Sequence, residues 1–80
     1  MGARNTLLAV PPYPVETALK RLGHNLRTAR LRRRLTIKAV AQKIGTGVRA
    51  ISEAEKGKPS TSIAVYVALL WTFDLLSDFE

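Results

Sequence analysis

Five residues between two turn glycines, at 45 and 57, have the types and spacing to contact the edges of DNA bases. An arginine guanidinium can bond both acceptors of guanine, and a valine can touch the thymine methyl group. A glutamate can accept from cytosine, or can be a mere exposed helix charge that repels phosphate. A glycine either admits the backbone closely or is only a weak helix cap. The candidate base-reading residues are Gly47, Val48, Arg49, Ser52 and Glu53.

Groups that could hold phosphates lie on both sides of these five residues. Cationic side chains and helix-start amides contact the DNA backbone and position a protein without reading sequence. The candidates are Arg34, Thr36, Ile37, Lys38, Thr46, Lys56 and Lys58, with Ile37 contributing its amide rather than its side chain. The run Arg32–Arg34 sends its side chains in different directions, so at most two of them face DNA. An equally weighted alternative is a solvated helix end favoured by the helix dipole.

The charge distribution agrees with a polyanionic partner. The net charge is +7, and twelve basic residues lie between Lys20 and Lys58 against two acids, whereas residues 59–80 carry three acids and no base. Such a module suits phosphates because binding releases counterions, although charge alone fits an ordinary solvated surface as well. The chain has no cysteine and one histidine, His24, and Ser52 lacks an activating base. We therefore expect no enzyme, no cofactor and no metal site.

The segment 36–57 has the pattern of two short helices joined by a tight turn. Thr36 is a favourable N-cap, and Gly45 is the residue type that turns left-handed at little steric cost. Ala41 permits close approach of the helices, and Ile51 returns the second helix to the core. This spacing predicts a helix-turn-helix in which the second helix begins near Val48 and presents its polar side outward.

Three further helices and an arm complete the expected all-α fold of four to five helices. Residues 1–14 are expected to form an irregular proline-rich arm, and residues 15–80 the domain. Apolar spacing predicts a helix over 15–33, with a kink or late start at Gly23 because glycine weakens helices. Helices are also expected over 63–72 and 75–79, with a core stripe made of Ile63, Tyr66 or Val67, Leu70 and Phe73.

The apolar tail has more large side chains than a small domain is expected to cover. We expect an exposed dimer or partner interface made of Val65, Leu69, Trp71, Leu76 and Phe79. Tryptophan is a common interface anchor. The alternative is that Trp71 and Tyr66 merely close the core. The longest apolar run is too short to span a bilayer and no secretory leader is apparent, so we expect a cytoplasmic protein without membrane contact.

With these residues in place, the chain resembles the XRE-type, phage-repressor-like helix-turn-helix family. The motifs are LGHNLRTARLRRRLT, AQKIGTGVRAISEAEKGKP and the helix after PSTS. The resemblance implies a dimer on an inverted-repeat operator and a structural ion pair, here Arg30 with Glu55. An inward carboxylate needs such a partner, so we prefer this role for Arg30 over DNA contact. Two departures are Ile37, where the family has a phosphate-bracing glutamine, and Arg34, where it often has glycine.

Within that family the chain looks most like HipB-like antitoxins and their regulator relatives. This narrower resemblance rests on three features: the proline-rich segment before ETALKRLG, the motif TARLRRRLT and the motif VALLWTFDLLSDF. It implies an autoregulating repressor that binds a HipA-type kinase toxin. The alternative function is a protein-interaction module that binds such a partner and has weak or no specific DNA binding.

Overall fold

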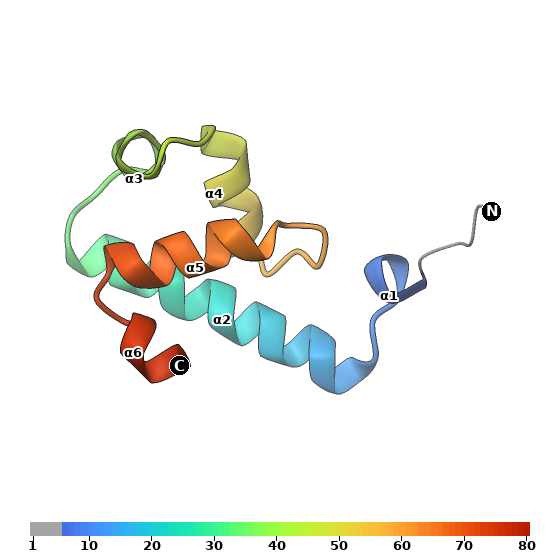
Figure 1. Ribbon diagram of the computed structural model, residues 1–80. Coiled ribbons are helices and arrows are strands. Elements are labelled where there is room, and N and C mark those ends of the chain that lie inside the picture. Colours follow the sequence, from blue (N-terminus) through green and yellow to red (C-terminus); the bar gives the residue numbers. More distant parts are fainter. Residues whose placement is uncertain (1–5) are drawn as a thin grey trace.

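The computed structural model describes residues 6–80, and these form an all-α domain (Figure 1). Its helices are α1 (Thr6–Ala9), α2 (Tyr13–Arg32), α3 (Ile37–Ile44), α4 (Val48–Glu55), α5 (Ile63–Thr72) and α6 (Leu76–Phe79). No strand occurs within the described residues. The expected all-α class is confirmed. The five helices α2–α6 make the body, and α1 is an additional short helix.

Local sequence signals set the ends of the short helices. The hydroxyl oxygen of Thr36 accepts from the amide of Ala39 at 3.0 Å, and that of Ser62 accepts from Ala64 at 3.1 Å. These side chains satisfy amides that have no partner inside their helices. Gly45 ends α3 in the left-handed region, with φ of 90°. The helix-turn-helix therefore has well-defined limits at both ends of α3.

The core lies where α2, α3, α4 and α5 meet. Its apolar residues are Leu26, Ala29, Val40, Ala41, Ile51, Ala54, Tyr66, Leu69, Leu70 and Phe73. Each large member contributes on the order of 1.5–3 kcal/mol through burial. The expected assignments of Ile63 and Leu69 were wrong, because Ile63 is exposed and Leu69 is fully buried. Leu69 lies three residues after Tyr66 and shares its face, whereas Ile63 begins the helix at the edge of the core.

The expected irregular arm over residues 1–14 also differs from the structure. Residues 6–9 form α1, and α2 begins at Tyr13 rather than Val15. Pro14 lies in the first turn of α2, where its missing amide hydrogen needs no partner. Residues 1–5 of the arm lie outside the described part of the chain.

Gly23 causes neither a kink nor a late start in α2. The helix runs through it without a break, and Gly23 is buried against the end of α4. A Cβ atom at Gly23 would lie 2.5 Å from the carbonyl oxygen of Ala54 and 2.7 Å from that of Glu55. A Cβ at Gly57 would lie 2.5 Å from the carbonyl oxygen of Leu19. The two glycines therefore let the backbones of α2 and α4 touch.

Candidate nucleic-acid interface

The α3–turn–α4 unit forms one side of the domain and is anchored by its inner residues. Val40 and Ala41 of α3 are buried, as are Ile51 and Ala54 of α4. Gly47 precedes α4 with extended backbone and leaves the first turn of the helix open. Figure 1 shows α3 and α4 together above α2 and α5. The first turn of α4 thus lies at the surface, as groove entry requires.

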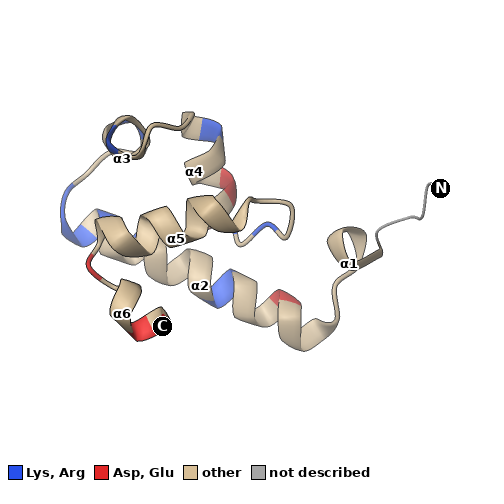
Figure 2. Cartoon of the chain, in the orientation of Figure 1, with Lys and Arg blue, Asp and Glu red and all other residues tan. Residues whose placement is uncertain are grey.

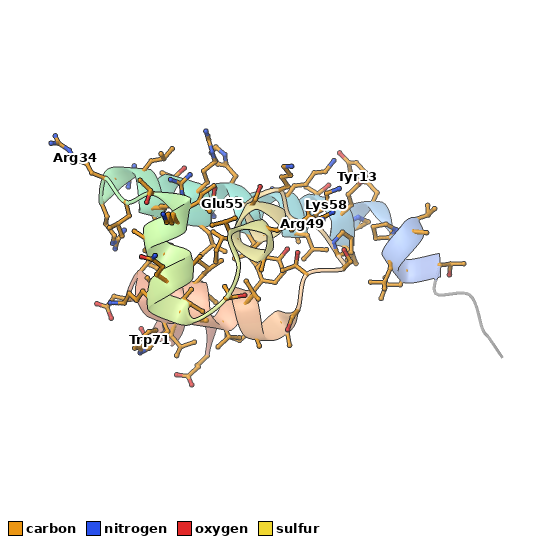
Figure 3. The ribbon with its side chains drawn as sticks, turned by 90° about the horizontal axis from the view of Figure 1, so that it is seen from above. Tyr13, Arg34, Arg49, Glu55, Lys58 and Trp71 are labelled. Atoms are coloured by element: carbon orange, nitrogen blue, oxygen red, sulfur yellow. The ribbon has the colours of Figure 1, made fainter. Side chains whose placement is uncertain are left out.

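The structure brings the five candidate base-reading residues together on the outer side of α4 and its start. Gly47, Val48 and Arg49 are exposed, while Ser52 and Glu53 are half-buried. Figure 3 looks onto this side of the domain, and Arg49 lies near its centre. Arg49 makes no ion pair among the residues described, so its guanidinium is free to bond base acceptors.

The candidate phosphate-binding residues lie in the α2–α3 turn, at the start of α3, in the turn before α4 and after the C-terminal end of α4. Arg34, Lys38, Lys56 and Lys58 are exposed, whereas Ile37 and Thr46 are half-buried. Figure 2 shows basic residues at the α2–α3 turn, at the start of α4 and in the α4–α5 loop, and acidic residues on α4 and around α6. The hydroxyl of Thr36 is occupied as a cap, and Ile37 packs against the core. These two positions offer the backbone rather than side chains to a phosphate.

Arg34 occupies the turn between α2 and α3 in a conformation that suits glycine. Its φ is 55°, and its side chain points away from the body in Figure 3. A residue with a Cβ atom in the left-handed region costs about 1–2 kcal/mol of strain in the folded state. Compared with glycine, such a residue also lowers the entropy of the unfolded chain, which favours folding and partly offsets the strain. The position where the resemblance placed a glycine is therefore strained in this chain.

We expect Arg34→Gly to raise the free energy of unfolding by about 0.5 kcal/mol, because it relieves that strain. Urea denaturation measures the change. Arg34→Ala is the matched control, since it removes the charge but keeps the Cβ atom, and its stability should stay close to that of the parent. If the alanine variant gained as much as the glycine variant, charge repulsion rather than backbone strain would be the cause.

Arg33 has a structural role that the sequence did not reveal. Its guanidinium donates to the carbonyl oxygens of Ala29 and Phe73, each at 2.9 Å, and lies 5.2 Å from the centre of the Phe73 ring. The positive charge thus sits at the C-terminal end of α5, where the helix dipole favours it. Arg33 joins α2 to α5. Arg32 and Arg34 are exposed, and their side chains make no ion pair with the described residues.

Arg30 and Glu55 form a buried ion pair between α2 and the end of α4. The Nε and Nη2 atoms of Arg30 donate to the two carboxylate oxygens of Glu55 at 2.6 and 3.1 Å. Nη1 of Arg30 donates to the carbonyl oxygen of Leu35 at 2.8 Å. This two-pronged geometry is the strong form of the pair, and it fixes the α2–α3 turn as well as α4.

Tyr66 fixes the loop that carries Lys58. Its hydroxyl donates to the carbonyl oxygen of Lys58 at 3.0 Å. Burial raises the pKa of the Tyr66 phenol above its usual value, and the charge of Glu53 acts in the same direction. The phenol therefore stays neutral and remains a donor at physiological pH. The α4–α5 loop is thus held against α5.

The five residues expected at the tail interface do not lie on one surface. Trp71 and Phe79 are exposed, and Val65 and Leu76 are half-buried. Leu69 is part of the core, so it cannot contribute to an exposed interface. Nζ of Lys43 lies 5.6 Å from the Trp71 ring, which identifies a cation–π contact at the edge of α3 and α5. Trp71 therefore does not close the core.

Comparison with known proteins identifies the family. The model described as "Helix-turn-helix domain" matches residues 21–78, well over half of the chain. Neither curated proteins nor solved structures give a match. Within the described part of the chain, no helix is both long and apolar enough to cross a membrane. The match covers the α3–α4 unit, and the chain belongs to the XRE-like helix-turn-helix family, whose members are typically DNA-binding and non-enzymatic.

Proposed function

We propose that the protein is a dimeric transcriptional regulator that binds an inverted-repeat operator in double-stranded DNA. The observation that carries this proposal is the exposed Arg49 at the start of α4, together with exposed lysines on α3 and after α4. Its base-reading set is Gly47, Val48, Arg49, Ser52 and Glu53. In this proposal residues 15–80 are the DNA-binding domain and α5–α6 supply the dimer contact. The protein acts in the cytoplasm.

Selection of bound duplexes from a random pool, at a stated salt concentration, tests this function. The expected product is an inverted repeat whose half-sites lie about 34–36 Å apart, because each α4 enters one major groove. A pool that shows no enrichment over its starting composition would contradict sequence-specific binding. An enriched single half-site would support DNA reading by α4 but not the dimer.

Two alanine variants separate base reading from phosphate contact. Arg49→Ala is expected to lose about 1–3 kcal/mol on the selected operator and little on random duplex, because the lost bonds go to a base. Lys56→Ala is expected to weaken binding to both duplexes alike and to lower the slope of log K against log salt by about 1. Fluorescence anisotropy over a salt series measures both effects.

The assignment of these two residues fails if both variants lose the same affinity on operator and on random duplex. Lys20→Ala is a suitable control, since Lys20 is exposed on the N-terminal half of α2 and pairs with Glu16 at 3.6 Å. Its operator affinity is expected to stay close to that of the parent.

We further propose that the regulator is a HipB-like antitoxin that represses its own operon with a HipA-type kinase toxin. Support comes from exposed apolar side chains outside α3 and α4, which include Val10, Tyr13 and Phe79. The same observation favours the second candidate function, a module that mainly binds such a partner. A neighbouring gene for a kinase-like protein, followed by co-purification of the two gene products, tests the partner. Specific operator binding by the isolated chain distinguishes the two candidates.

A further inference from the structure

A cavity of about 290 Å³ lies between α1, the N-terminal half of α2 and the loop that follows α4. Its charged lining consists of Lys20, Lys56 and Lys58 together with one acid, Glu16, and we call it the lysine cavity. None of the five candidate base-reading residues lines it. In Figure 1 the α4–α5 loop extends from the body toward α1, so the lysine cavity lies at the far end of α4 from its base-reading start.

A close backbone contact at Gly57 brings the three lysines together. A Cβ atom at Gly57 would lie 2.7 Å from the Cα atom of Lys20, so the loop touches α2 at that residue. Lys56 and Lys58 flank Gly57 in the sequence and are therefore carried to the same part of α2. Figure 3 shows Lys58 beside the N-terminal half of α2.

Hydrogen bonds fix the loop in this position. The amides of Lys56 and Lys58 donate to the carbonyl oxygen of Glu53 at 3.2 and 3.1 Å, and the hydroxyl of Tyr66 donates to the carbonyl oxygen of Lys58 at 3.0 Å. A ligand in the lysine cavity therefore has to order lysine side chains but not the loop backbone. This lowers the entropy that binding costs.

The lysine cavity has more positive charge than its own acid neutralises. Within residues 6–80, Lys56 and Lys58 make no ion pair, and Lys20 lies 3.6 Å from Glu16. Glu55, which precedes Lys56, is already bound by an arginine of α2. Three lysines against one glutamate leave a surplus of two positive charges in the lining. Each ammonium group offers donors and no acceptor, so a matching ligand brings several negative oxygens.

We propose that the lysine cavity binds a small molecule that carries a diphosphate group. A diphosphate concentrates several charges and acceptor oxygens in a small volume, whereas each phosphate of a DNA backbone carries only one charge. The rest of the lining includes the apolar residues Leu8, Pro11 and Pro59. Apolar walls with a few converging polar groups are typical of small-molecule sites, and they suit a nucleoside attached to the diphosphate.

The site has a consequence for regulation, and this consequence rests on the proposed DNA-binding function. Lys56 and Lys58 are also proposed contacts to DNA phosphates. The same ammonium groups cannot hold a diphosphate and the operator backbone together. A bound diphosphate therefore lowers the affinity for the operator.

Titration calorimetry of the full chain without DNA, at fixed ionic strength, tests the binding of inorganic pyrophosphate and of ADP. Lys20→Ala is expected to weaken the binding of both about fivefold, because it removes one of three cations. Arg21→Ala is the matched control, since it removes the same charge from a neighbouring exposed position that does not line the cavity. Its affinity should stay within about twofold of the parent.

Glu16→Gln is expected to change the affinity in the opposite direction, with about threefold tighter binding, because the carboxylate repels the ligand and competes for Lys20. The side chains of Lys20 and Glu16 are 65% and 45% exposed, so both substitutions should leave the fold intact, which circular dichroism checks. If ADP binds more tightly than pyrophosphate, the apolar wall holds the nucleoside; equal affinities identify the diphosphate group alone as the ligand chemistry.

Three outcomes would overturn the proposal. The first is a parent protein that binds neither pyrophosphate nor ADP. The second is an equal loss in Lys20→Ala and Arg21→Ala, which would indicate unspecific attraction to a basic surface. The third is a loss of operator affinity in Lys20→Ala without any binding of the two ligands, which would assign the cavity to the DNA backbone.

Fluorescence anisotropy with the selected operator tests the regulation. Saturating pyrophosphate should weaken operator binding by the parent at least about threefold more than sodium chloride of equal ionic strength does, and Lys20→Ala should lose most of this effect. Binding of both partners without competition would refute the shared use of Lys56 and Lys58. If the ligands bind but no duplex is enriched, the cavity stands and the DNA-binding function is wrong. If an inverted repeat is enriched but neither ligand binds, the regulator stands and the cavity proposal is wrong.

Discussion

Gly23→Ala is expected to destabilise the domain by roughly 3 kcal/mol or more, although alanine is the better helix former. Alanine at an ordinary helix position gains about 1 kcal/mol over glycine. At position 23 the added Cβ atom would meet the backbone atoms of Ala54, Glu55 and Gly57 at 2.5–2.7 Å. Backbone cannot move aside as a flexible side chain can, so the clash outweighs the helix gain. Because each kcal/mol shifts the melting temperature by about 4–8 °C, the loss should exceed about 12 °C.

Gly47→Ala is the matched control for stability. A Cβ atom at Gly47 meets nothing within 4 Å, and its φ of −81° suits any residue. Its cost is limited to a poorer helix cap, about 1 kcal/mol or less. Calorimetry measures the melting temperatures of the Gly23→Ala and Gly47→Ala variants and compares them with that of the parent. A Gly23 variant that melts at or above the parent temperature would show that the contact between α2 and α4 yields easily.

Glu55→Ala is expected to cost about 3–5 kcal/mol, because it leaves the buried guanidinium of Arg30 without its partner. The side chains of Arg30 and Glu55 are 9% and 6% exposed, so water cannot replace the lost bonds. The measurement is urea denaturation of Glu55→Ala, of the single variants Glu55→Leu and Arg30→Met, and of the double variant that combines Glu55→Leu with Arg30→Met.

The double variant should lose only about 1–2 kcal/mol, mainly because the carbonyl of Leu35 loses its donor. A buried ion pair can be replaced by apolar residues at much lower cost than the removal of one partner. If the losses of the single variants simply added, Arg30 and Glu55 would contribute independently rather than as a pair.

Features set by short-range chemistry could be predicted from the sequence. The cap at Thr36, the left-handed turn at Gly45 and the inward position of Ile51 each depend on residues within a few positions. The inward position of Glu55 predicted a cationic partner, and the family resemblance identified Arg30 as that partner. The structure shows the ion pair between the two residues. The outer residues of α4 followed from the same helical spacing.

Features set by distant contacts could not be predicted. Gly23 looked like a weak point in a helix, because its neighbours Ala54 and Gly57 lie more than thirty positions away. Arg33 looked like one cation in a run, because its acceptor Phe73 is forty residues later. In α5 nearly every side chain is apolar, so periodicity could not tell the buried Leu69 from the exposed Ile63.

The attachment of α4 by its far end has a consequence for engineering. The two glycines and the buried guanidinium–carboxylate link hold the last turn of α4. Val48 and Arg49, at the opposite end, are exposed and support nothing in the core. A library that randomises these two positions should therefore keep its melting temperature while its preferred target changes, which makes the domain a scaffold for building orthogonal gene switches.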